Sequence, residues 1–582
     1  MKNILEANVS NIFLFVACSI LIFTECNVQV KIDQGILVGT TEETLFEGKI
    51  YFAFYGVPYA RPPLGKLRFK NPKPPLKWNY PFDGTTEFHG ACAQSHIVHK
   101  HGLYGVEDCL HLNIYTPELP KHTNTRPMRA VILWIHGYAF TSGFSHIHGP
   151  DFLIDNDIIV VTLTHRIGVF GFMKLNETDN HTNMGLKDII RGLKWIHRNI
   201  GAFGGNNDNI TIMSSGSAAT FVSLLLTTKF RKLFAKVIIQ SGSMFAPSLF
   251  HNDHQFEKNK LEQYLKQNGF KNISSTPSSD LLTLSSKIYN KNDFMNTQKP
   301  LIPFMPIKET NAMNSLLHQD SPEFVKTFKK FSEIPILIGF NSREGITEVV
   351  PFIHNPGYLK LLKAFKYIVP FFGGCSYKYG TQEYYDIGEV IKKRYFKDDI
   401  NEQSFDEFLT YVSDLYKFPI YKFIQTYLNL SDNPMYVYKF NYVGKFNVAK
   451  ATAIAGANVK IKGAAHGDEI CYVLKCDPLW ENYVKVKKDL HNPDKLFIKQ
   501  IGEMWANFAK SGNPTPSNKS DVTWLPMTKY GDNLFIFGKN NILSNSKKEL
   551  KMYTFWNDLY EKYYKPHICH GTPSETGVPY VG

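Results

Sequence analysis

The sequence predicts an α/β protein with a large, mostly parallel sheet, and two kinds of pattern support this prediction. Residues 130–135 and 158–163 are continuous apolar runs rich in β-branched side chains. Strands buried on both faces of a parallel sheet have this composition, whereas apolar and polar residues alternate along a strand that has one face in solvent. Between residues 184 and 200 the apolar side chains recur every three or four positions, as on a helix that covers one face of a sheet.

Strands and helices alternate through much of the chain, which is typical of a parallel sheet with helices on both faces. Residues 250–331 are polar and helical in pattern and contain no clear strand. We therefore expect a helical insertion over one end of the sheet. Later strands are expected at 210–213, 236–239, 334–340 and 435–440, and further helices at about 217–226 and 497–510.

The composition is that of a globular protein and shows no sign of a nucleic-acid, cofactor or metal site. The 582 residues are 43% hydrophobic, enough for a large core, and no Pro-rich or Gly/Ser-rich linker divides them. The net charge is +13, but Lys and Arg are scattered and no basic helix stands out, so we expect no nucleic-acid partner. We also expect no cofactor, because no nucleotide-binding fingerprint occurs, and no metal, because His96, His99 and His101 lack Cys or carboxylate ligands at suitable spacing.

The N-terminus has the pattern of a secretory signal peptide. Lys2 precedes an apolar stretch at residues 12–23, which is followed by Thr24-Glu25-Cys26. About a dozen apolar residues suit a signal-peptide core and are too few to span a bilayer comfortably. We expect a signal peptide at residues 1–26, no later membrane span, and a secreted, extracellular mature chain. An uncleaved anchor is the alternative, because Glu6 makes the charged region irregular.

The sequons and cysteines agree with an oxidising, extracellular compartment. Six cysteines remain after residue 26, and an even number permits disulfides without specifying the pairs. The pairing of four of them, Cys375, Cys471, Cys476 and Cys569, is left open. N-glycosylation sequons, each an Asn followed by x-Ser or x-Thr, occur at Asn176, Asn180, Asn209, Asn272, Asn429 and Asn518.

A series of short motifs runs in a fixed order across nearly the whole mature chain. They include Gly56-Val57-Pro58-Tyr59-Ala60-Arg61-Pro62-Pro63, Glu107-Asp108-Cys109-Leu110-His111-Leu112-Asn113, Trp134-Ile135-His136-Gly137, Gln240-Ser241-Gly242-Ser243, Glu344-Gly345 and Gly463-Ala464-Ala465-His466-Gly467-Asp468-Glu469. These motifs resemble those of the type-B carboxylesterase and cholinesterase family. The resemblance implies the α/β-hydrolase fold, formed as a single domain over residues 27–582.

The same resemblance implies three structural pairs. Cys92 and Cys109 match the first disulfide of the family, and two ion pairs, Arg68 with Glu107 and Arg166 with Asp188, match its buried ion pairs. A charge inside a protein is tolerable only when it is paired, so we expect these four charged residues to be structural. The loop between Cys92 and Cys109 has no Trp to hold a choline cation, which argues against an acetylcholinesterase.

An esterase of this type needs a nucleophilic Ser, a His that takes its proton, and an acid that orients the His. In this fold they follow one another in the order Ser, acid, His. Glu344 and His466 match the acid and base positions of the family in that order. The resemblance therefore implies that an acid and base pair is present.

The nucleophile position is the departure from the family. The family has Gly-Glu-Ser-Ala-Gly or close to it, whereas this chain has Ser214-Ser215-Gly216-Ser217-Ala218-Ala219. Counting forward through the strand at 210–213 places Gly216 at the nucleophile, and counting backward from residue 240 places Ser215 there. We prefer the forward count, because a deletion inside a buried strand would reverse every side chain. Ser217 is the alternative nucleophile, because small residues lie two places on either side of it.

The loop that should supply the oxyanion donors also departs from the family. The family has His-Gly-Gly-Gly or His-Gly-Gly-Ala, but this chain has Tyr138 in place of a Gly, after His136-Gly137. We expect the oxyanion contacts to come from Gly137, Tyr138 and Ser217. A Tyr side chain at this place threatens both the backbone dihedrals and the space that the donors need.

Together these features predict a secreted carboxylesterase-like protein with impaired catalysis. Such a protein would act by binding a small hydrophobic ligand or ester, or an extracellular protein partner. The alternative is an active carboxylic-ester hydrolase that uses Ser217, or less favourably Ser215, with His466 and Glu344.

Overall fold

A computed structural model gives the fold of the chain. It describes residues 28–565 and residue 568, except for 87–89, 96–102, 121–127, 176–180, 247–253, 290–301, 308, 310–315, 317–332, 373–374, 376, 398 and 518–521. The predicted signal peptide, three of the sequons (Asn176, Asn180 and Asn518), Cys569 and the three loop histidines (His96, His99 and His101) lie outside the described residues.

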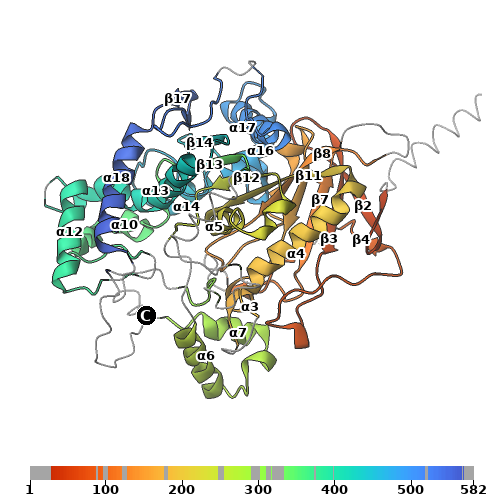
Figure 1. Ribbon diagram of the computed structural model, residues 1–582, viewed down its shortest axis with the longest axis horizontal. Helices are drawn as coiled ribbons and strands as arrows, with labels where there is room; N and C mark the ends of the chain where they lie inside the picture. The colour runs from red at the N-terminus through yellow and green to blue at the C-terminus, as the bar shows by residue number, and fades with distance from the viewer. Residues whose placement is uncertain are drawn as a thin grey trace, which may run out of the picture.

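The described residues form a 13-stranded sheet whose centre is parallel and whose edges are antiparallel (Figure 1). The order across the sheet is β1-β2-β3-β7-β10-β8-β11-β12-β13-β14-β16-β17, with β4 beside β2. The strands are β1 Val28–Ile32, β2 Gly35–Glu43, β3 Ile50–Pro58, β4 Phe82–Asp83, β7 His111–Thr116, β8 Arg129–Ile135, β10 Ile159–Leu163, β11 Gly205–Ser215, β12 Lys236–Gln240, β13 Ile336–Asn341, β14 Met435–Phe440, β16 Leu534–Phe537 and β17 Ile542–Ser544.

Two short ladders lie outside this sheet, one between β5 (Gln94–Ser95) and β6 (Leu103–Tyr104) and one between β9 (His148–Gly149) and β15 (Lys475–Cys476). The helices are α2 Asp151–Ile154, α3 Gly168–Phe172, α4 Met184–Asn199, α5 Gly216–Leu225, α6 Gln255–Gln267, α7 Ser278–Ser285, α10 Val350–His354, α11 Leu359–Lys363, α12 Gln382–Tyr395, α13 Phe405–Leu430, α14 Val448–Ala453, α15 Ile470–Val473, α16 Trp480–Lys487, α17 Pro493–Ser511 and α18 Lys547–Tyr563.

The central strands carry apolar side chains on both faces, and each face packs into its own core. On β8, Leu133 and Ile135 belong to the core that includes residues of α4, α5, α13 and α18, whereas Ile132 and Trp134 belong to the core formed with α2, α15, α16 and α17. This alternation explains the unbroken apolar run of β8, because neither side of the strand meets water. The expectation of a mostly parallel sheet with helices on both faces is confirmed.

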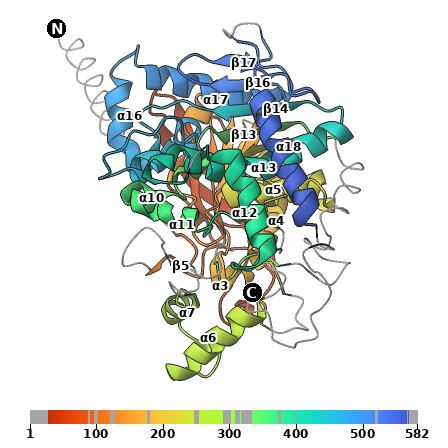
Figure 2. The same ribbon diagram turned by 90° about the vertical axis from the view of Figure 1, so that its left-hand side faces the viewer.

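The predicted insertion is helical in its described part. Helices α6 and α7 pack together and project from one end of the molecule in both views (Figures 1 and 2). Among the described residues, no helix is both long and apolar enough to cross a bilayer.

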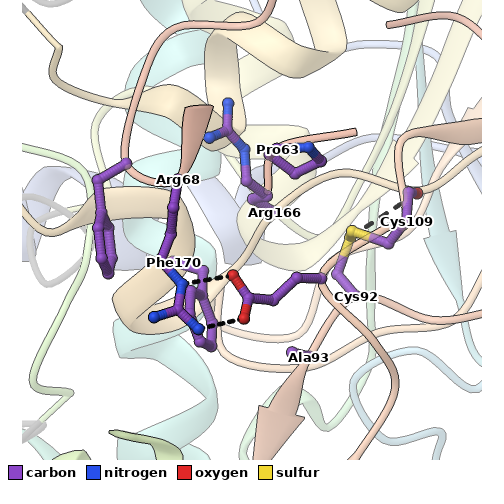
Figure 3. A pocket seen from close by; sticks show the side chains of 9 residues that line it. Pro63, Arg68, Cys92, Ala93, Cys109, Arg166 and Phe170 are labelled. Atoms are coloured by element: carbon purple, nitrogen blue, oxygen red, sulfur yellow. Dashed lines mark hydrogen bonds and ion pairs between the residues drawn. A yellow bond between two sulfur atoms is a disulfide. The ribbon is translucent and has the colours of Figure 1, made fainter. Parts of the chain in front are cut away.

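The structural pairs predicted from the sequence are present. Cys92 and Cys109 form a disulfide, and Arg68 Nε donates to a Glu107 carboxylate oxygen at 2.6 Å. Figure 3 shows Arg68 beside Phe170 and close to Cys92 and Cys109. The structure also forms a disulfide between Cys471 and Cys476, a pair that the sequence left open, and Cys375 is disulfide-bonded as well.

The second ion pair, between Arg166 and Asp188, is buried and fully hydrogen-bonded. Arg166 Nε and Nη2 each donate to an Asp188 oxygen at 2.7 Å, and Nη1 donates to the Lys70 carbonyl at 2.8 Å. The side chains of Arg166 and Asp188 are 3% and 0% exposed. A buried pair of this kind is costly to break, because the remaining charge is left without a partner.

Replacing Asp188 by Ala should lower the free energy of unfolding by about 3–5 kcal/mol, since it leaves the Arg166 guanidinium buried without its carboxylate. The measurement is urea unfolding followed by fluorescence. Glu481→Ala is the control, because the exposed Glu481–Lys485 pair should contribute less than about 1 kcal/mol. Equal losses in the two variants would contradict the structural role of the buried pair.

Candidate active site

The candidate site lies where β11 and β13, two central strands of the sheet, end. The chain turns from β11 directly into α5, and the segment η6 (Glu344–Ile346) follows shortly after β13. His466 comes from the loop between α14 and α15. In open α/β sheets the carboxyl ends of the strands are the usual place for a ligand site, because loops from different strands converge there.

Glu344 and His466 form a direct hydrogen-bonded pair. His466 Nδ1 lies 2.7 Å from Glu344 Oε2. Because the carboxylate can only accept, Nδ1 carries the proton and Nε2 is the nitrogen available to other groups. Burial lowers the pKa of His466, but the Glu344 carboxylate outweighs it and raises this pKa to about 9. Burial tends to raise the pKa of Glu344, but His466 and the hydrogen bonds to the carboxylate together lower it.

The second oxygen of Glu344 is held by neighbouring strand ends. Oε1 accepts from the Ser241 hydroxyl at 2.7 Å and from the Asn341 amide at 2.5 Å. Glu344 is fully buried, so these bonds replace the water that its charge loses on folding. Neither Ser241 nor Asn341 was assigned a role from the sequence, although Ser241 lies within one of the quoted motifs.

The loops that carry the acid and the histidine are tied to each other. The Arg343 amide donates to the Ala464 carbonyl at 2.9 Å, and the Ala464 amide donates to the Ser342 hydroxyl at 3.0 Å. On the other side, the Gly345 amide donates to Ser413 on α13 at 3.1 Å. The relative position of Glu344 and His466 is therefore fixed by bonds that do not involve their own side chains.

Gly216 is the residue of the turn that faces His466. It has φ +57°, in the left-handed region that favours glycine, and a Cβ added to it would lie 3.1 Å from His466 Nε2. The direction in which a side chain would leave residue 216 is therefore toward the free nitrogen of the histidine.

Ser217 points elsewhere. Its hydroxyl oxygen accepts a hydrogen bond from the Phe140 amide at 3.2 Å and lies 3.0 Å from the position of a Cβ added to Gly137. Ser215 is still part of β11, where it is paired in register with Gln240. Among the described residues, no hydrogen bond joins either serine hydroxyl to His466. A side chain at residue 216 would therefore face the histidine, whereas Ser217 is bonded to the Phe140 amide and Ser215 lies in the β11–β12 ladder.

The loop predicted to supply oxyanion donors packs tightly on the start of α5. A Cβ on Gly137 would lie 2.7 Å from the Ala218 amide nitrogen, so this position requires glycine. The next residues form a turn in which the Thr141 amide donates to the Tyr138 carbonyl at 3.0 Å, and Ala139 and Phe140 have φ of +51° and +57°. The side chain of Tyr138 is 54% exposed and lies on the solvent side of this turn. The Ser217 amide lies in the first turn of α5, where backbone amides lack helical acceptors.

A second buried carboxylate, Glu469, lies next to the pair and was not assigned a role from the sequence. It accepts from Asn341 Nδ2 at 2.6 Å and from the Tyr438 hydroxyl at 3.3 Å. Burial, and then the charge of Glu344, raises the pKa of Glu469 to about 7. Its position three residues after His466 was visible in the sequence, but its contacts with strands β13 and β14 were not.

Three of the predicted glycosylation sites are described. Asn272 and Asn429 are exposed. Both polar atoms of the Asn209 side chain form hydrogen bonds: Nδ2 donates to the Lys510 carbonyl at 3.2 Å, and Oδ1 accepts from the Lys236 ammonium group. Glycosylation at the sequons stays a prediction.

The fold has a solved counterpart. The structure of a juvenile hormone esterase from Manduca sexta, with OTFP covalently attached, matches this chain with a TM-score of 0.73 at 24% identity and covers 92% of this chain and 100% of that one. The architecture described above is therefore that of an α/β hydrolase.

The sequence comparisons give the family. The model of the carboxylesterase family matches residues 27–556. A juvenile hormone esterase from Tribolium castaneum is 30% identical over 494 residues, which cover 80% of this chain and 82% of that protein. Esterase FE4 from Myzus persicae is 30% identical over 548 residues, which cover 91% and 92% of the two chains. The chain belongs to the carboxylesterase family.

Replacing Glu469 by Gln should change how stability depends on pH. With its pKa raised from 4.5 to about 7, the folded protein binds this proton more tightly than the unfolded chain does. Stability therefore falls as pH rises from 4.5 to 7, by at most roughly 3 kcal/mol. As pH rises from 5 to 6.5, the Tm of the Glu469→Gln variant should therefore fall less than the Tm of the parent protein, as measured by differential scanning calorimetry.

The pH window separates this effect from that of His466. Because the pKa of His466 is raised from 6.5 to about 9, its stabilising contribution is complete below pH 6.5 and is lost only as pH rises through 9. Glu481→Gln, at an exposed carboxylate, is the matched control and should follow the parent. Parallel Tm profiles for Glu469→Gln and the parent would show that Glu469 is ionised normally.

Proposed function

We propose that this protein is a secreted member of the carboxylesterase family with impaired ester hydrolysis, which binds a hydrophobic ester or related ligand at the site beside His466. The observation that carries the proposal is the position of Gly216. Its missing side chain would point at His466 Nε2 from 3.1 Å. In this interpretation Gly216 occupies the nucleophile position, Glu344 and His466 are the acid and base, and no hydroxyl is present to be activated.

The chemical consequence follows from the mechanism of acyl transfer. A serine esterase passes through an acyl-enzyme, which requires an oxygen nucleophile on the protein. A His–Glu pair alone can polarise water but cannot form that intermediate. Removal of the nucleophile from a well-studied serine protease lowers kcat by about a million-fold. Tyr138 replaces a glycine of the oxyanion loop, and a backbone shift there that removed one oxyanion donor would cost a further factor of about 100 to 1,000.

The preserved pair supports a binding role. With its pKa raised to about 9, His466 is protonated at neutral pH, so Nε2 donates a hydrogen bond rather than accepting a proton. An ester carbonyl or a carboxylate oxygen is a suitable acceptor for such a donor. The two relatives named juvenile hormone esterases act, by name, on a hormone ester, which supports an ester as the ligand class.

Secretion has independent physical support. The described residues contain the disulfides Cys92–Cys109 and Cys471–Cys476, and Cys375 is also disulfide-bonded. Several disulfides in one chain are typical of proteins in oxidising compartments and are rare in cytosolic proteins. The N-terminal apolar segment is of signal-peptide length.

An active hydrolase that uses Ser217 is the second candidate, and one observation favours it. Ser217 is the residue next to Gly216, and its buried hydroxyl lies in the same turn. The elbow would have to shift by one residue to bring this hydroxyl to His466, and the bond from the Phe140 amide to Ser217 would have to break.

Hydrolysis of p-nitrophenyl acetate by the purified protein should be slow and show no burst. Ser217→Ala should leave this rate unchanged within about twofold, because Ser217 is not the nucleophile. His466→Ala should lower any residual turnover, because the protonated histidine that would polarise the ester carbonyl is lost. The measurement is stopped-flow absorbance at 400 nm, and a stoichiometric burst that Ser217→Ala removes would establish the second candidate.

Ligand binding is tested on the same preparations. The parent protein should bind an aliphatic methyl ester without consuming it, as measured by calorimetry and by recovery of the intact ester. His466→Gln should weaken the affinity by about tenfold or more, the loss expected for one charge-assisted hydrogen bond. Equal affinity in the parent and the His466→Gln variant would place the ligand away from this histidine.

A further inference from the structure

Helix α4 carries a row of basic side chains along its outer face. Arg191, Lys194 and Arg198 are spaced three and four residues apart, which places them on one side of the helix. Lys229, from the short helix η4 (Lys229–Leu233), joins them: the Lys194 and Lys229 ammonium groups lie 5.0 and 5.6 Å from the centre of the same Phe230 ring. These four residues are called the α4 basic stripe.

The stripe has no acidic partner. In the described part of the chain, no carboxylate lies within 4.0 Å of any of its four cationic groups, whereas Lys187 on the same helix is paired with Glu309 at 3.0 Å. The only acid on α4, Asp188, is buried and neutralised by Arg166. Burial lowers the pKa of Lys194 most, and the charges of Arg191, Lys229 and Arg198 lower it further.

The α4 basic stripe lies on a helix that is packed against the sheet. The opposite side of α4 is buried against the sheet through Leu186, Ile189 and Leu193. Figure 1 shows α4 as a continuous helix lying across the face of the sheet. From Arg191 to Arg198 the stripe extends about 10 Å along the helix axis, at 1.5 Å per residue. The packed helix therefore holds the backbone positions of these cations at a fixed spacing, so that the helix does not have to form when a polyanion binds.

We propose that the α4 basic stripe binds a linear sulfated polysaccharide of the heparan sulfate type. Sulfate groups along such a chain complement the unbalanced row of cations, and polysaccharides of this type are extracellular, where the proposed function places the protein. The stripe itself is separate from the site beside His466, so the binding does not depend on whether ester hydrolysis survives.

Two other polyanions fit the stripe less well. An anionic membrane is bound most firmly when apolar side chains insert beside the basic ones, and none of the exposed large hydrophobic residues in the described chain lies on α4 or η4. Single-stranded nucleic acid is usually held by aromatic rings on which bases stack, but the Phe230 ring is half-buried and has two lysines over it.

The test is binding of the full mature protein to immobilised heparin by surface plasmon resonance in 0.15 M NaCl. The variant combining R191Q, K194Q, R198Q and K229Q should bind at least about tenfold more weakly, with a reduced dependence on salt. The control combines K460Q, K488Q, K548Q and K551Q, four exposed lysines elsewhere, and removes the same number of charges. It should bind within about twofold of the parent.

Several outcomes would overturn the proposal. Equal losses in the stripe variant and the control would show attraction by net charge alone, and no binding of the parent to heparin would exclude the ligand. Tighter stripe-dependent binding to duplex DNA or to vesicles with phosphatidylserine would assign the stripe to another partner. Should the fourfold variant unfold, as judged by circular dichroism, Lys194→Gln and Lys488→Gln are compared in the same way, and only the first should weaken heparin binding.

Discussion

The turn from β11 into α5 is the constraint on which the rest of the site depends. β11 is held in register on both sides, with Ser214 opposite Ile135 of β8 and Ser215 opposite Gln240 of β12. A shift of one residue would break both ladders and exchange the two faces of the strand. Two close approaches add to this: a Cβ on Gly242 would lie 2.3 Å from the Gly216 carbonyl oxygen, and one on Gly137 would lie 2.7 Å from the Ala218 amide. The residue that faces His466 is therefore set by the whole sheet.

The pair formed by Glu344 and His466 stabilises the fold whether or not a nucleophile is present. Glu344 is fully buried, and His466, about a quarter exposed, carries the positive charge that balances it. Removing one partner of a buried ion pair lowers the free energy of unfolding by roughly 3–5 kcal/mol, because the other charge is left unpaired. The hydrogen bonds of this pair do not include residue 216. Under the proposed function, a chain of this fold would therefore keep the pair without a nucleophile at that position.

Much of the fold could be predicted from the sequence, because its signals are local or pairwise. The apolar runs of β8 and β10 specify strands buried on both faces, and the family motifs implied the Cys92–Cys109 disulfide and the Arg166–Asp188 pair. The forward count assigned Gly216 to the nucleophile position, and this assignment stays a prediction. The N-terminal strands β1 to β3 and the long helix α13 carried weaker signals and were not predicted.

What could not be predicted depends on contacts between distant segments. The raised pKa of Glu469 results from burial among strands β13 and β14, and the bond from the Phe140 amide to Ser217 joins two loops. The α4 basic stripe was not recognised because its cations alternate with apolar residues in the sequence, and Lys229 joins them only in space. Its lack of acidic partners is a property of the folded surface.

A fluorophosphonate probe, with peptide mapping by mass spectrometry, tests whether Gly216 occupies the nucleophile position. The parent protein should remain unlabelled, because no serine hydroxyl is in line with His466. Probed above pH 9, where His466 loses its second proton, the Gly216→Ser variant should gain an adduct at position 216, which shows that the probe reaches this position and that His466 can act as the base. A stoichiometric adduct on Ser217 or Ser215 of the parent protein would contradict the account and show a working esterase.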